Sequence, residues 1–74
     1  MTITIYKSKT NPDLGICIQE VRKEITVWVD EFEGGEAYQD DWSYDEDQPD
    51  FSSVQEAQDY IYQKWGDVEF VETY

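Results

Sequence analysis

The sequence predicts an α+β fold: a four-stranded antiparallel meander, one helix packed on one face, and a short C-terminal strand that returns beside the first strand. Three observations predict it. Apolar and polar residues alternate through much of residues 2–44, apolar residues recur at helical spacing over 53–65, and residues 68–73 are again rich in β-branched and aromatic side chains. With 74 residues, 39% of them hydrophobic, we expect a single small domain spanning 1–74.

Three strands are expected before the middle of the chain. The first covers residues 2–8, where Ile3 and Ile5 share one face. The segment 9–14 contains Asn, Pro and Asp, which favour a turn, so the chain reverses there. Alternation resumes over 15–21 and, after a charged break, over 25–33.

Two consecutive glycines at 34–35 predict a tight hairpin and set the register of the fourth strand. If they are the two loop residues, the register is Glu31 with Tyr38, Val29 with Asp40, Val27 with Trp42 and Ile25 with Tyr44. Trp42 and Tyr44 are then expected on the core face. Trp28 and Phe32 are expected on the opposite face, as rings among carboxylates.

One helix is expected over 53–65. Residues 45–50 contain no apolar side chain and include a proline, which predicts an exposed loop before it. Ser53 and Glu56 match the capping box, in which the serine hydroxyl accepts the backbone N–H three residues on. Apolar residues then follow every three or four positions, and Gly66 is placed to end the helix.

The residue inventory argues against catalysis and cofactors. There is no histidine, so the usual general base near neutral pH and the commonest metal-binding side chain are both missing. Cys17 is the only cysteine, which excludes a disulfide within the chain and favours a reducing, cytoplasmic compartment. Because it alternates with Ile16 and Ile18, Cys17 is expected on the outer face as a small packing residue.

The twelve-residue calcium-binding pattern is only partly present in residues 45–56. Asp45, Asp47 and Glu56 stand at the first, third and twelfth positions of the twelve-residue pattern. However, Pro49 occupies the fifth position and Asp50 the sixth, where a glycine is required for the sharp turn. The sequence therefore predicts no specific metal site, and it leaves open weak, nonspecific divalent-cation binding to Asp45, Glu46, Asp47 and Asp50.

Charge is the most prominent property of the chain. Asp and Glu number 18 against 5 Lys and Arg, for a formal net charge of -13. This excludes direct binding to a phosphate backbone, and no run approaches the ~20 apolar residues needed to span a membrane. The densest stretch holds ten carboxylates and no basic residue: Asp30, Glu31, Glu33, Glu36, Asp40, Asp41, Asp45, Glu46, Asp47 and Asp50.

These ten carboxylates, with Trp28 and Phe32, form the predicted partner-binding surface. Duplex DNA carries one charge per roughly 1.7 Å of axis. Carboxylates on one face of a strand repeat about every 6.6–6.8 Å, near the ~7 Å expected between successive phosphates on one DNA strand. An acidic hairpin can therefore imitate nucleic acid in a groove lined with lysine and arginine. We expect a non-catalytic inhibitor or regulator of a nucleic-acid-binding protein, with restriction, CRISPR or transcription machinery as candidates in a phage or mobile element.

The alternative is a small protein-protein interaction module or housekeeping protein, whose acidity serves solubility. Such a module can form a homodimer through the outer aromatic face or through an exposed edge strand. Carboxylates on an edge hairpin also block association between sheets, so the charge alone does not decide between the two classes.

Like charges this dense predict a stability that depends on salt. Unit charges about 4 Å apart interact by ~1 kcal/mol even in water, and raising salt from about 0.01 to 1 M shortens the Debye length from roughly 30 to 3 Å. We expect the melting temperature, followed by circular dichroism in sodium chloride, to rise across this range. A melting temperature unmoved by salt would show that the charges are too dispersed to repel one another.

Overall fold

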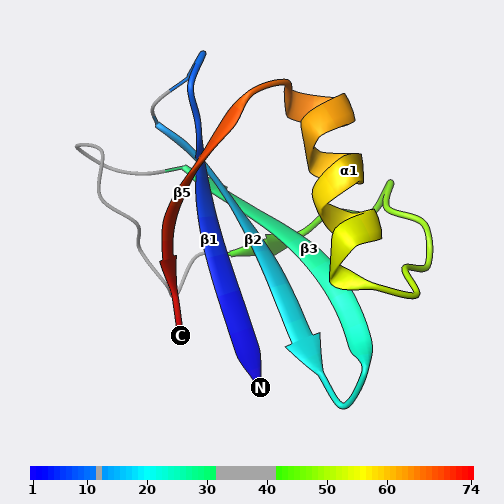
Figure 1. The fold of residues 1–74 in the computed structure, drawn as a ribbon. Helices are drawn as coiled ribbons and strands as arrows, with labels where there is room; N and C mark the ends of the chain where they lie inside the picture. Colours follow the sequence, from blue (N-terminus) through cyan, green and yellow to red (C-terminus); the bar gives the residue numbers. More distant parts are fainter. Residues whose placement is uncertain (12, 32–41) are drawn as a thin grey trace.

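The computed structural model describes residues 1–11, 13–31 and 42–74. Within these residues it contains one antiparallel sheet of five strands, in the order β4-β3-β2-β1-β5, and one helix, α1 (Figure 1). The elements are β1 (Thr2–Ser8), β2 (Leu14–Val21), β3 (Glu24–Glu31), β4 (Ser43–Tyr44), α1 (Val54–Trp65) and β5 (Val68–Thr73). The predicted fold class is confirmed, as is the return of the last strand beside the first.

The main core lies between α1 and one face of the sheet. Its buried members are Tyr6, Ile16, Ile18, Ile25, Val27, Ala57, Ile61 and Val68. These come from the strands and from the stripe of α1 that faces them, as the predicted spacing requires. Truncating a fully buried isoleucine such as Ile61 to alanine typically costs about 2–5 kcal/mol. Within the described residues, no helix is long and apolar enough to cross a membrane.

Both ends of α1 are set by the residues that predicted them. The Ser53 hydroxyl accepts the Glu56 backbone N–H at 3.2 Å, which satisfies one of the unpaired donors of the first turn. Gly66 has a φ of +74° and donates its N–H to the Tyr62 carbonyl at 2.9 Å. Glycine adopts this left-handed conformation at little cost, so the helix ends there.

The predicted register of the fourth strand is wrong. β4 pairs with β3 through Trp28 with Tyr44 and Val29 with Ser43, whereas the glycine turn placed Tyr44 opposite Ile25. The shift is three residues. Because side chains alternate with period two along a strand, an odd shift moves the fourth-strand rings from the helix side to the other face. The predicted turn at 34–35 lies outside the described residues.

Gln48 explains why β4 ends at Tyr44. Its side-chain amide accepts the Val27 N–H at 2.7 Å and donates to the Val27 carbonyl at 2.9 Å. The Asp45 N–H donates to the same carbonyl at 3.1 Å. The chain therefore leaves β3 after Tyr44, and one side-chain amide provides the backbone hydrogen bonds that a longer strand would have made.

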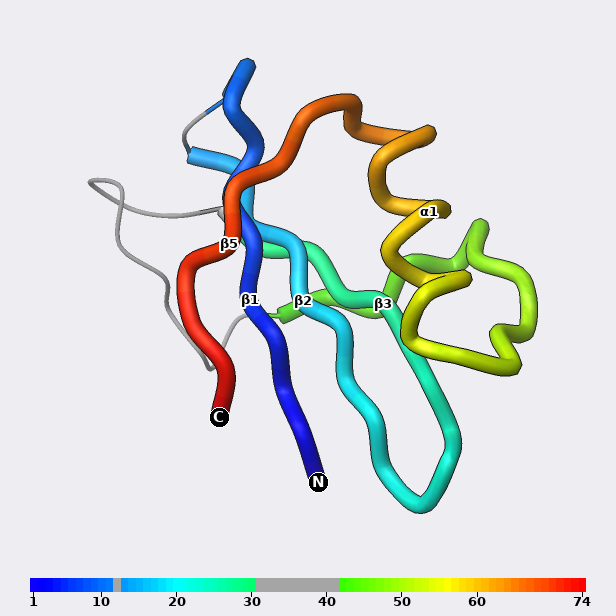
Figure 2. Tube along the Cα trace, in the orientation of Figure 1, coloured from blue at the N-terminus to red at the C-terminus, as the bar shows by residue number. Residues whose placement is uncertain are grey.

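The two termini lie at the same end of the sheet (Figure 2). Tyr74 continues the pairing of β5 with β1: its N–H donates to the Ile3 carbonyl at 2.8 Å, and the Ile3 N–H donates to the Tyr74 carbonyl at 3.2 Å. The last residue of the chain is thus held against the second strand residue of β1.

The turn between β2 and β3 is strained. Val21 pairs with Glu24 across it, and the two residues between them, Arg22 and Lys23, have φ values of +50° and +70°. This two-residue hairpin turn normally carries Asn-Gly, since an L residue in the left-handed region costs roughly 1–2 kcal/mol.

Replacing Lys23 by glycine should therefore stabilise the protein. We expect Lys23→Gly to add about 1 kcal/mol to the free energy of unfolding, which raises the melting temperature by roughly 4–8 °C. Lys23→Ala removes the same charge but keeps a Cβ, so it serves as the matched control. Equal melting temperatures for the two variants would contradict the strained turn.

Candidate functional site

The predicted partner-binding surface is partly described. Phe32, Glu33, Glu36, Asp40 and Asp41, together with the side chain of Glu31, lie outside the described part of the structure. Trp28 and Asp30 are half-buried on β3. The remaining members belong to the loop between β4 and α1.

Three carboxylates of that loop are exposed, as predicted: Glu46, Asp47 and Asp50. Asp47 lies 3.4 Å from the Lys64 ammonium, and its side chain is 86% exposed. A solvent-exposed pair of this kind contributes little to stability. The three carboxylates therefore remain exposed to solvent.

Asp45 is not exposed, and the predicted loop is wrong at this residue. Its side chain is 7% exposed. The Tyr60 hydroxyl donates to one carboxylate oxygen at 2.6 Å, and the Lys64 ammonium donates to the other at 2.7 Å. The physical reason is the docking of the loop on β3 through Gln48, which brings Asp45 against α1. Asp45 therefore joins the loop to α1, and its carboxylate is not accessible on the surface.

The charges of this cluster stabilise one another. Burial alone would raise the pKa of Asp45, but hydrogen bonds from Lys64 and Tyr60 outweigh it and hold the pKa below its ordinary value of 3.8. The hydrogen bond to Asp45 raises the pKa of Lys64, and burial followed by the bond to Asp45 raises the pKa of Tyr60. The Lys64 ammonium also lies 4.9 Å from the Trp65 ring centroid. Asp45 and Lys64 are both charged at neutral pH.

Removing the Asp45 charge should destabilise the protein in a pH-dependent way. We expect Asp45→Asn to cost about 1.5–3 kcal/mol at pH 7, the usual contribution of a hydrogen bond to a charged group. Because the folded pKa is lowered, this contribution is present above pH 3.8 and is lost as the pH falls through the folded pKa. Urea unfolding at several pH values should show wild type and variant converging below about pH 4.

Asp47→Asn is the matched control, since it removes a carboxylate near the same lysine. We expect almost no change in unfolding free energy, because Asp47 is exposed. A cost equal to that of Asp45→Asn would contradict the role of Asp45 as the buried anchor.

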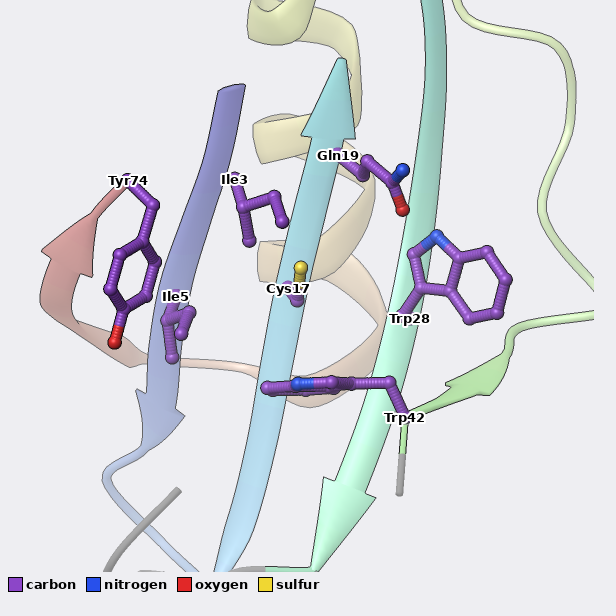
Figure 3. A pocket seen from close by; sticks show the side chains of 7 residues that line it. All are labelled: Ile3, Ile5, Cys17, Gln19, Trp28, Trp42 and Tyr74. Atoms are coloured by element: carbon purple, nitrogen blue, oxygen red, sulfur yellow. The ribbon is translucent and has the colours of Figure 1, made fainter. Parts of the chain in front are cut away.

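A second region lies on the face of the sheet turned away from α1 (Figure 3). Strand pairing places side chains on this face in rows. One row crosses all five described strands as Glu72, Ile5, Cys17, Trp28 and Tyr44. The next row contains Tyr74, Ile3, Gln19 and Thr26. The rows bring rings from both ends of the sheet onto one surface.

These rows form a hollow of about 450 Å³, which we call the outer hollow. Its lining residues are Ile3, Ile5, Cys17, Gln19, Trp28, Trp42 and Tyr74. The Trp42 ring reaches from the residue before β4 over β2 towards Cys17, and Tyr74 lies on the opposite side of the hollow, beside β1 (Figure 3). Ile5 and Cys17 are 0% and 4% exposed although they face away from the helix, so this face carries an apolar layer of its own.

The rings of the outer hollow are held in place. The Trp28 indole N–H donates to the Thr26 hydroxyl at 2.9 Å. The Trp28 and Tyr44 rings pack edge to face, with 5.3 Å between their centroids. The Tyr74 hydroxyl donates to the Glu72 carboxylate. A carboxylate therefore stands at the edge of the hollow, beside a lining ring.

Cys17 faces outward, as predicted. Burial raises the pKa of its thiol to about 12, so the thiol is protonated at neutral pH. Among the described residues that line the outer hollow, none carries a formal charge.

The sequence did not predict the outer hollow, because the glycine-turn register sent Trp42 to the core face. One signal was present: Ile3 and Ile5 alternate away from Tyr6, which belongs to the main core. An apolar face of β1 opposite the helix needs its own cover.

No match links the chain to a known protein. A scan of protein-family models, a search of curated proteins and a search of solved structures each find no match. Nor does the described part of the chain bring together three or more His, Cys, Asp or Glu side chains that could hold a metal ion. The charges and the outer hollow are the observations that bear on function.

Proposed function

We propose that the chain is a non-catalytic acidic protein of the cytoplasm that occupies a basic, nucleic-acid-binding surface on another protein. One observation carries the proposal. Lys64 is the only basic residue from position 24 to 74, and both ion pairs within the described residues use it internally, with Asp45 and Asp47. Residues 24–74 contain no other basic side chain that could neutralise the acidic stretch 30–50, so this stretch keeps most of its negative charge for a partner.

Exposed carboxylates continue beyond the loop. Further exposed acids follow along α1 and β5: Glu56, Asp59, Asp67, Glu69 and Glu72. A surface of one sign attracts a basic partner over a Debye length and raises the association rate. Nucleic acid carries the same sign, so it would compete for the same partner surface.

The loop is preorganised for such binding. Gln48 fixes it to Val27 of β3, and Asp45 fixes it to Lys64 and Tyr60 of α1. A segment that is ordered before association loses less conformational entropy on binding. The exposed carboxylates of the loop are thus held in place by these contacts, in which the Asp45 charge is paired with Lys64.

A second candidate, a protein-protein interaction module, is favoured by the exposed apolar groups of β5. Phe70 is 59% exposed and Val71 41% exposed on this edge strand. An edge strand with apolar side chains can pair with another chain, including a second copy. This candidate predicts association that depends little on salt.

A pair of charge-matched variants tests the proposed function. The first replaces Asp40, Asp41, Asp47 and Asp50 by asparagine. The control replaces the exposed carboxylates of Asp13, Glu24, Asp59 and Asp67 by amides, which removes the same charge elsewhere. Immobilised proteins are incubated with a nuclease-treated extract of the native cell, and retained proteins are quantified by mass spectrometry between about 50 and 200 mM salt.

We expect wild type and control to retain the same basic protein at low salt and to release it at high salt or on addition of duplex DNA. The first variant should bind it roughly tenfold or more weakly, since close charge pairs across an interface contribute about 1.5 kcal/mol or more. Retention of the partner by the first variant at the wild-type level, or indifference to duplex DNA, would contradict the proposal.

A further inference from the structure

The geometry points to an arginine side chain as the occupant of the outer hollow, supplied by the basic partner. The inference deepens the proposed function and rests on it for the source of the arginine. It adds a binding site of a different kind from the acidic loop, because the hollow recognises one side chain by its shape and rings.

Three aromatic rings surround the outer hollow. Trp28 lies on β3, Trp42 immediately before β4 and Tyr74 immediately after β5 (Figure 3). A cation within about 6 Å of such ring faces is attracted by their negative π surface. Guanidinium is planar and weakly hydrated, so it stacks on rings more readily than the compact ammonium of lysine.

The outer hollow also offers acceptors for guanidinium N–H groups. Glu72 stands in the same cross-strand row as Ile5, and its carboxylate is held beside the hollow by the Tyr74 hydroxyl. Gln19 adds a side-chain amide to the lining. A carboxylate is the acceptor that matches the forked donors of arginine.

Charge complementarity argues for a cation over an apolar occupant. The Cys17 thiol on the floor of the hollow is protonated and neutral, so the attraction for a cation comes from the Glu72 carboxylate beside the hollow and from the ring faces. Lys7 lies one row farther along this face, in register with Glu69 on β5, and does not line the hollow. The net charge of -13 concentrates cations around the whole molecule. The volume of about 450 Å³ falls within the usual range of roughly 300–1,000 Å³ for binding pockets.

The test uses a blocked glycine-flanked arginine peptide as the probe, with its citrulline counterpart as a neutral isostere and its lysine counterpart as a second cation. Nuclear magnetic resonance follows the indole N–H signals during titration of the full chain. We expect saturable shifts at Trp28 and Trp42 with the arginine peptide. Trp65 packs against the main core on the other side of the sheet and should not shift.

Variants on β5 locate the site. We expect Tyr74→Leu and Glu72→Gln each to weaken arginine-peptide binding by about two- to fivefold, the loss typical of one exposed cation–π or ionic contact. Phe70→Leu is the ring control, because Phe70 is similarly exposed but packs against Tyr6 on the helix side. Asp67→Asn is the charge control. Both controls should bind as wild type.

Several results would overturn the inference. Equal binding of the citrulline peptide would show an apolar site, and equal binding of the lysine peptide would show a general response to cations. Equal losses in the two control variants would show that the charge of the molecule acts alone. One variant separates the two proposals, namely the protein in which Asp40, Asp41, Asp47 and Asp50 are replaced by asparagine. It should lose the cellular partner yet keep the arginine-peptide shifts at Trp28 and Trp42.

Discussion

The structure depends on the anchoring of residues 45–50 between β3 and α1. Gln48 takes both backbone groups of Val27, and the Asp45 carboxylate receives hydrogen bonds from Lys64 and Tyr60. This anchoring ends β4 after Tyr44, and so it decides which face of the sheet receives the fourth-strand rings. A buried carboxylate is costly unless it is paired, and Lys64 and Tyr60 supply that pairing for Asp45.

The same anchor separates two kinds of surface. Lys64 neutralises Asp45 inside the molecule, while the exposed loop carboxylates keep their charge. On the far face of the sheet, Trp28 and Trp42 line the outer hollow together with the buried Ile5. In the function proposed here, long-range attraction by the acidic loop and short-range selection by the rings would be complementary, since charge sets the association rate and fitted anchors set the lifetime of a complex.

Features encoded by neighbouring residues could be predicted from the sequence. The helix was predictable because Ser53 and Gly66 define its ends locally, and the strand order because short connections favour a meander. The fourth-strand register was not. The paired glycines give a local signal, whereas the observed register is accompanied by the hydrogen bonds of Gln48 to Val27, 21 residues away. Likewise, the polar composition of residues 45–50 predicted that Asp45 is exposed. Its partners Tyr60 and Lys64 lie 15 and 19 residues away, so their contacts appear only in the folded chain.

The most direct measurement of this account is the set of nuclear Overhauser contacts made by the Trp42 indole. With the ring in the outer hollow, we expect contacts from Trp42 to Cys17 and Ile5, on the face turned away from α1, and none to Ile61 of the helix. Contacts between Trp42 and Ile61 would contradict it. They would restore the glycine-turn register, place the ring in the main core and leave the sheet without an outer hollow.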